Sequence, residues 1–173
     1  MSYEAEMLKK FEMPARKEVE QALLITLFNH NGVIKEFASG EEIVNEIANK
    51  FALNDNQRTV SLERPYHKEN RIVKTPLWHR LLYRAADSLA KEKLVSRPTS
   101  TIVLTNKREW MLTENGFDEA LKLLNIPQTQ KEFLPTKSYE VQKIVKKLIE
   151  TPSPKTTILL IKKRKWYRLQ ENL

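Results

Sequence analysis

Apolar residues recur at the spacing of an amphipathic helix in three stretches, residues 15–29, 39–51 and 75–93. The first stretch follows Pro14, which suits a first helical turn. In the second stretch Ser39 is a good N-cap. We therefore expect three helices, each with one apolar face.

The third stretch has clear boundaries and two different faces. Thr75 is a suitable N-cap, and Pro76 suits the first helical position. At about 100° per residue, apolar and polar side chains separate onto opposite sides. The apolar side holds Trp78, Leu81, Leu82, Ala85 and Leu89, and the polar stripe holds Arg80, Tyr83, Arg84, Asp87 and Lys91. One face should pack in a core, and the other is either a solvated face or a binding face.

The segment before this helix has little regular pattern. Asn54 can cap one short turn through Val60. Residues 61–74 then show little periodicity, and Pro65 and Asn70 disfavour a helix. We expect residues 61–74 to form a loop.

After the third helix the pattern changes to that of strands. Residues 100–105 and 108–113 are rich in β-branched, aromatic and apolar side chains. They flank Asn106 and Lys107, a plausible turn. This pattern predicts a β-hairpin with Lys107 and Arg108 at its tip.

A further helix should close this part of the chain. Thr113 can cap it, and the apolar pattern continues to about Asn125. We divide the chain into an N-terminal lead over 1–14, a domain over 15–127 and a basic helix-plus-hairpin extension over 128–173.

The extension repeats part of the predicted hairpin. The ten residues from Thr101 to Trp110 align with those from Thr157 to Trp166, with six identities and a constant offset of 56. The extension is either a second, partial copy of the unit or a chance match between lysine-rich segments.

Composition narrows the class of protein. The 173 residues are 40% apolar and 30% charged, which is the balance of a globular protein. The sequence has neither an apolar run near the ~20 residues of a membrane span nor a signal peptide, so we expect a cytoplasmic protein without a membrane partner. It has no cysteine and three scattered histidines, so we expect no metal and no cofactor.

The charge favours a polyanionic partner. The net charge is +8 and the pI about 9.6. Residues 128–173 carry 11 basic against 4 acidic side chains, and residues 58–84 carry 7 against 2. The excess is therefore concentrated in the extension and around the third helix.

Three helices followed by a hairpin form the element order of a winged helix-turn-helix, a mainly α fold with β-hairpins. A helix fits the DNA major groove, so Arg80 and Arg84 could contact base edges and phosphates, and a basic wing could contact the backbone. Consecutive lysines and arginines in the extension suit phosphates. The candidate DNA-binding residues are Arg71, Lys74, Arg80, Tyr83, Arg84, Lys107, Arg108, Lys162, Lys163, Arg164 and Lys165.

The segment from about Pro14 to Leu124 resembles the N-terminal winged-helix domain of Mrr-type restriction proteins. The residues that carry the resemblance are Arg71, Trp78, Leu89, Leu94, Trp110, Leu112, Thr113 and Gly116. The chain departs from the family pattern at Asn106 and Lys107, where a glycine is usual in the wing turn. The resemblance implies sequence- or modification-dependent recognition of double-stranded DNA in a restriction or defence system, with cleavage by a separate nuclease domain or subunit.

The sequence shows no nuclease site of its own. It has neither an Asp/Glu-x-Lys strand nor a His-Asn-His arrangement in a plausible context, so we expect no enzymatic activity. A homodimer is compatible with these expectations. Two alternatives remain at this point, a winged-helix transcription regulator and a winged-helix module that binds an acidic protein.

Overall fold

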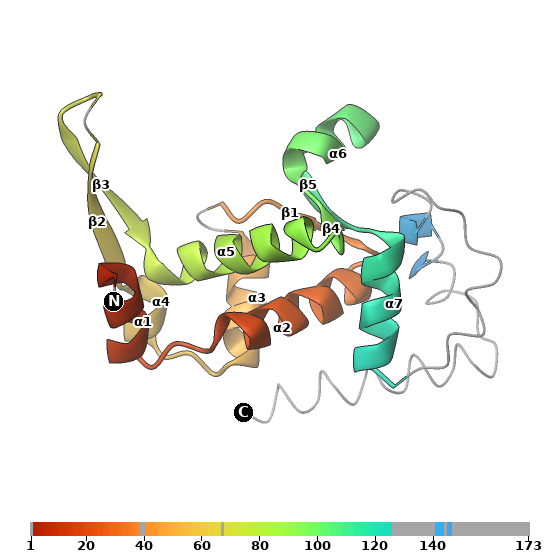
Figure 1. The fold of residues 1–173 in the computed structure, drawn as a ribbon, viewed down its shortest axis with the longest axis horizontal. Coiled ribbons are helices and arrows are strands. Elements are labelled where there is room, and N and C mark those ends of the chain that lie inside the picture. The colour runs from red at the N-terminus through yellow and green to blue at the C-terminus, as the bar shows by residue number, and fades with distance from the viewer. Residues whose placement is uncertain (1, 39–40, 67, 126–140, 144, 147–173) are drawn as a thin grey trace.

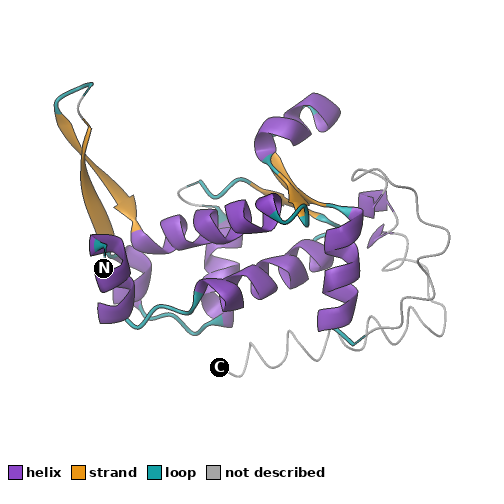
Figure 2. Cartoon of the chain, viewed as in Figure 1, coloured by secondary structure: helices purple, strands orange, loops and turns teal. Residues whose placement is uncertain are grey.

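The computed structural model describes residues 2–38, 41–66, 68–125, 141–143, 145 and 146. Helices predominate, and the strands form small antiparallel sheets (Figures 1 and 2). The second copy of the predicted repeat, residues 157–166, lies outside the described residues, and so do the four basic residues 162–165 within it. Within the described part of the chain, no helix has the length and apolarity needed to cross a membrane.

The core lies between three helices, α2 (Arg16–Asn29), α5 (Leu77–Lys91) and α7 (Glu114–Leu123). Helix α2 packs against both of the others. Phe28 of α2 and Phe117 of α7 lie in contact, with ring centroids 5.7 Å apart. The sequence pattern predicted these helices because apolar side chains recur on one face of each. The side chains of the apolar side of α5, which were expected to pack in a core, are buried, namely Trp78, Leu81, Leu82, Ala85 and Leu89, and Trp110 of the later strand is buried as well.

Two shorter helices complete this side of the molecule. Helix α3 (Glu42–Lys50) buries the apolar face that the sequence predicted, although Ser39, its expected N-cap, lies outside the described residues. Helix α4 (Asp55–Thr59) begins after Asn54, whose side-chain oxygen accepts a hydrogen bond from the Gln57 amide at 2.9 Å. The predicted turn after Asn54 is therefore confirmed.

A three-stranded antiparallel sheet holds the two ends of this core together. It consists of β1 (Val33–Lys35), β5 (Glu109–Leu112) and β4 (Val95–Ser96) in that order. Ile34 pairs with Trp110, and Val95 pairs with Leu112. The sheet thus joins the segment after α2 to the segment before α7.

Residues 61–74 were expected to form a loop, and this expectation is wrong. The strands β2 (Ser61–Tyr66) and β3 (Arg71–Pro76) form a hairpin that projects from the body, as Figure 1 shows. An isolated hairpin has two edges, where a proline is tolerated, and Asn70 takes the left-handed conformation that a tight connection requires.

The hairpin also changes the start of α5. Thr75 and Pro76 were predicted as the N-cap and first residue of the helix, but both pair with β2 at the end of β3. Pro76 then occupies the N-cap position, and the helix begins at Leu77. Because the pairing of β2 with β3 extends to Pro76, strand β3 continues into helix α5 without a linker.

The predicted hairpin over residues 100–113 is wrong in its first half. Residues Pro98–Thr105 form helix α6, whereas Glu109–Leu112 form a strand as expected. Pro98 occupies the first helical turn, and Asn106 ends the helix in the left-handed conformation. Lys107 and Arg108 therefore follow a helix and do not form the tip of a hairpin.

The N-terminal lead contains a helix that the sequence pattern did not predict. Helix α1 (Tyr3–Lys10) begins after Ser2, whose hydroxyl accepts a hydrogen bond from the Ala5 amide at 3.2 Å. None of its residues is buried. It therefore lies on the surface of the molecule.

Candidate functional site

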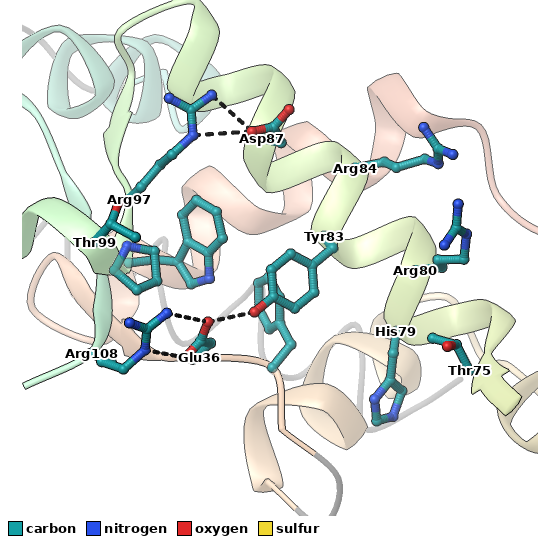
Figure 3. A pocket seen from close by; sticks show the side chains of 13 residues that line it. Glu36, Thr75, His79, Arg80, Tyr83, Arg84, Asp87, Arg97, Thr99 and Arg108 are labelled. Carbon is teal, nitrogen blue, oxygen red and sulfur yellow. Dashed lines mark hydrogen bonds and ion pairs between the residues drawn. The ribbon is translucent and has the colours of Figure 1, made fainter. Parts of the chain in front are cut away.

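A groove of about 700 Å³ lies along the exposed side of α5 (Figure 3). Its other walls are the segment after β1, the start of α6 and the start of β5. Among the described residues, four arginines line it, namely Arg80, Arg84, Arg97 and Arg108. The groove thus collects guanidinium groups from three separate segments of the chain.

Three aromatic rings pack together beside these arginines. Phe37 lies 5.6 Å from Tyr83 and 5.9 Å from Trp110, and Tyr83 lies 6.0 Å from Trp110, measured between ring centroids. Trp110 is buried, whereas Tyr83 is partly exposed. The rings join α5 to β5 and fix the position from which Arg108 extends.

Glu36 connects the aromatic cluster to Arg108. It accepts a hydrogen bond from the Tyr83 hydroxyl at 2.5 Å, and its two oxygens accept from Arg108 Nε at 2.9 Å and Nη2 at 3.2 Å (Figure 3). The hydrogen bonds from Arg108 and then Tyr83 hold the pKa of Glu36 below its ordinary value. Burial and the hydrogen bond to Glu36 raise the pKa of Tyr83 to about 12. Tyr83 is therefore a neutral donor whose proton is already engaged.

A second carboxylate, Glu4 of α1, holds the two arginines of α5. It accepts hydrogen bonds from Arg80 Nε at 2.9 Å, from Arg84 Nε at 2.6 Å and from Arg84 Nη2 at 2.8 Å. Burial opposes ionisation of Glu4, but the hydrogen bonds from Arg84 and Arg80 outweigh it and lower its pKa. The side chains of Glu4 and Arg80 are only 13% and 17% exposed. This pair is therefore more shielded from water than an ordinary surface ion pair.

Arg97 is held by a third carboxylate, Asp87 of α5. Its Nη2 and Nε atoms lie 2.8 Å and 3.0 Å from Asp87 Oδ1 (Figure 3). The hydrogen bond from Arg97 holds the pKa of Asp87 below its ordinary value, so the carboxylate stays charged at neutral pH. Each arginine of the groove is thus ion-paired and held in one orientation.

This arrangement is suited to binding anions. A guanidinium group presents its donors in a planar fork that matches a carboxylate or a phosphate. A phosphate could replace the carboxylates that now occupy the arginine donors. Within the described residues, no group of three or more histidine, aspartate or glutamate side chains could hold a metal ion.

The structure brings together only some of the residues that the sequence singled out. Arg80, Tyr83, Arg84 and Arg108 line the groove. Lys107 is exposed beside it and is not part of its lining. The candidate residues of the β2–β3 hairpin, Arg71 and Lys74, lie outside the groove.

Three residues of the site were missed, Arg97, Glu4 and Glu36. Arg97 directly precedes Pro98, and a proline at the start of a helix is a signal that could have placed it. No local pattern links Glu4 to Arg80, which is 76 positions away in the sequence. The same holds for Glu36 and Arg108, which are 72 positions apart.

Comparisons of the chain with models of protein families, with curated proteins and with solved structures give no match. The resemblance to Mrr-type domains therefore stays an expectation that depends on the sequence motif alone.

Proposed function

We propose that this chain is a winged-helix module that binds double-stranded DNA through the groove on α5. The observation that carries the proposal is the set of four ion-paired arginines that line one groove, two from α5 and two from the segments before α6 and β5. Cations that are fixed on rigid elements can match the regular spacing of phosphates and base edges.

The order of the elements supports a winged helix. Helix α2, strand β1, helix α3, helix α5 and the strands β4 and β5 follow one another, with α4 and the β2–β3 hairpin between α3 and α5. In this interpretation α5 is the helix that enters the major groove, because its outer side carries Arg80, Tyr83 and Arg84. Helix α6 lies between β4 and β5, at the place where a wing would have its turn.

The four arginines have different roles in this proposal. Arg80 and Arg84 project from one rigid helix, so they can keep the fixed geometry that base recognition requires. Arg97 and Arg108 flank helix α6 and are better placed for phosphates of the adjoining backbone. In each case DNA would replace a carboxylate as the partner of the guanidinium group.

The biological role that we propose is recognition of a sequence or a modified base within a restriction or defence system. It depends on the resemblance to Mrr-type domains, in which a separate nuclease domain or subunit cuts the DNA. We assign no catalytic role to this chain.

Binding to labelled duplexes at several salt concentrations tests the proposal. We expect Arg80→Ala and Arg84→Ala each to cost about 1–3 kcal/mol at a preferred sequence, because a base contact is lost. The matched control is Lys122→Ala on α7, which removes one positive charge away from the groove and should change affinity less than about twofold. Absence of salt-dependent duplex binding by the wild-type chain, or binding to an acidic peptide in its place, would reject the proposal.

A further inference from the structure

We propose that the β2–β3 hairpin is a second DNA-contacting element that binds the duplex next to the site of α5. The inference depends on the proposed function, because it assigns a further contact to the same DNA. It follows from the attachment of the hairpin, from the side chains on it and from their charge.

The hairpin is rigidly attached to the helix that carries the groove. Strand β3 ends at Pro76 and α5 begins at Leu77, so no flexible linker separates them. The Leu77 amide donates a hydrogen bond to the Val60 carbonyl at 2.8 Å, which closes the base of the hairpin. Leu62, near this base, is buried. When α5 lies on DNA, the hairpin must therefore extend to one side of it (Figure 1).

The exposed part of the hairpin combines an apolar side chain with cations. Alternate residues of a strand share a face, so Ile72 and Lys74 lie on one face and Arg71 on the other. Ile72 is 65% exposed on strand β3, in the hairpin that projects from the body (Figure 1). Lys74 and Arg71 are exposed to a similar degree. The hairpin therefore offers an apolar and a cationic side chain on one face and a second cation on the other.

The acidic partners of these cations do not prevent this contact. Lys74 lies 3.4 Å from Glu63, and Arg71 lies 2.5 Å from Glu69. All four side chains are more than half exposed, and ion pairs in such positions contribute little because water and salt screen them. Phosphates at the rim of a groove can replace these carboxylates.

Duplex DNA is the partner that fits both features. An apolar side chain next to lysine and arginine is typical of proteins that contact the minor groove, where the apolar residue meets sugars or base steps and the cations meet the flanking phosphates. Because the hairpin continues directly into the helix that we propose to lie on DNA, an adjoining groove of the same duplex is the surface within its reach. We therefore assign Ile72 to the minor groove and Arg71 and Lys74 to its phosphates.

The test compares two duplexes that contain the same binding site for α5. One has about 12 base pairs and the other about 24, so only the longer duplex has a further helical turn that the hairpin can contact. The wild-type chain should bind the longer duplex more tightly. Arg71→Gln combined with Lys74→Gln should abolish this preference, reduce the salt slope on the longer duplex by about two, and leave the shorter duplex unaffected. Ile72→Ala should reduce the preference without changing the salt slope.

The charge-matched control is Lys17→Gln combined with Lys122→Gln, which removes two exposed cations from α2 and α7. If the hairpin variant and this control prefer the longer duplex to the same degree, the hairpin does not contact DNA and this inference is overturned. Binding to the shorter duplex would in that case still support the proposed function of α5. Failure of the wild-type chain to bind either duplex would overturn both. Circular dichroism of each variant shows whether it is folded.

A different observation, the contact of Glu4 with both arginines of α5, carries a second inference. We infer that α1 is an internal competitor of DNA, in which the Glu4 carboxylate occupies the donors that would bind phosphate or base. This inference also depends on the proposed function. Helix α1 buries none of its residues, and Gln57 holds its C-terminal end by donating hydrogen bonds to the Phe11 and Glu12 carbonyls at 2.9 Å and 3.3 Å. Release of the helix would uncover the half-buried Leu8, which packs against the core, but no fully buried side chain of α1.

Glu4→Gln tests this inference, and Glu6→Gln on the same helix is its control. Both variants remove one negative charge, but Glu6 is exposed and is not among the partners of Arg80 or Arg84. Affinity for a duplex at low salt should increase at least about fivefold in Glu4→Gln and much less in Glu6→Gln. Equal changes in the two variants would show that Glu4 acts only through net charge and would overturn the competition. Absence of binding in the wild type and both variants would reject the proposed function as well.

Discussion

Gly116 shows why a single small residue is required at the start of α7. A Cβ atom at this position would lie 1.9 Å from the carbonyl oxygen of Leu94, closer than any real contact. Thr113 holds the start of α7 against the same backbone segment. Its amide donates a hydrogen bond to the Leu94 carbonyl at 3.0 Å, and its hydroxyl donates one to the Lys93 carbonyl at 2.6 Å. The Thr-x-x-Gly motif therefore joins α7 to the end of α5 through backbone contacts.

We predict that Gly116→Ala destabilises the protein by about 2 kcal/mol or more, because the methyl group would collide with backbone that cannot rotate away. Elsewhere in a helix the same change would stabilise by up to about 1 kcal/mol, so the sign of the effect is informative. Urea unfolding measures it. Asn115→Ala, at the exposed neighbouring position, should change the free energy of unfolding by less than about 0.5 kcal/mol. Stabilisation by Gly116→Ala would show that α7 and Leu94 are not in contact.

At the scale of elements, helices with a continuous apolar face could be predicted from the sequence. The faces of α2, α3, α5 and α7 recur every three or four residues over two or more turns, and each of these helices is present. The hairpin of β2 and β3 could not be predicted in this way. Of its described side chains, Glu63, Arg71, Ile72 and Lys74 are exposed, so on this part of the hairpin no buried face imposes an alternation of apolar and polar residues.

Helix α6 illustrates a different difficulty. Its β-branched and apolar residues are typical of a strand, yet Ile102, Val103 and Leu104 are exposed on a helix. Pro98 and Asn106 mark the two ends of the helix in the structure, but we interpreted Asn106 only as the turn of a hairpin and did not use Pro98. Tertiary contact decides the outcome, since Thr101 is fully buried against β5.

Thr101 gives the prediction at this scale. Its hydroxyl donates to the Glu109 carbonyl at 2.5 Å and accepts from the Glu109 amide at 3.2 Å. Thr101→Val keeps the shape but leaves both backbone groups without these partners, so we expect a loss of about 1–3 kcal/mol in thermal or urea unfolding. Thr99→Val, exposed on the same helix, is the control and should have little effect. Equal stability of the two variants would mean that the hydroxyl does not fix α6.

The candidate site could be predicted only in part for the same reason. The stripe of α5 is a local pattern, and it correctly placed Arg80, Tyr83 and Arg84 on one side of the helix, although the side chain of Arg80, paired with Glu4, is only 17% exposed. The carboxylates that hold the arginines come from distant parts of the chain and follow no spacing rule. A sequence shows that a helix has a basic face, but it does not show whether that face is already occupied.

At the scale of the whole molecule, the hairpin and the groove are both extensions of α5. The hairpin precedes the helix directly, and the groove follows its exposed side, so a single rigid element positions both proposed contacts. The groove itself is nearly balanced in charge, because Glu4, Glu36 and Asp87 pair with its four arginines. The affinity for DNA would therefore depend on how readily phosphates and bases replace the carboxylates that now pair with the arginines, more than on the net charge of the protein.

The packing of α2 against α7, and of β1 against β5, also has a consequence for synthesis on the ribosome. The segment from residue 16 to residue 35 is made early and its partners α3 and α5 follow it, but β5 and α7, which also pack against it, begin only at Glu109 and Glu114. The apolar surface that β5 and α7 cover therefore stays exposed until most of this part of the chain has been translated. A chain that stops before β5 would contain the α5 arginines and the hairpin, but it would lack the strand and the helix that close the core.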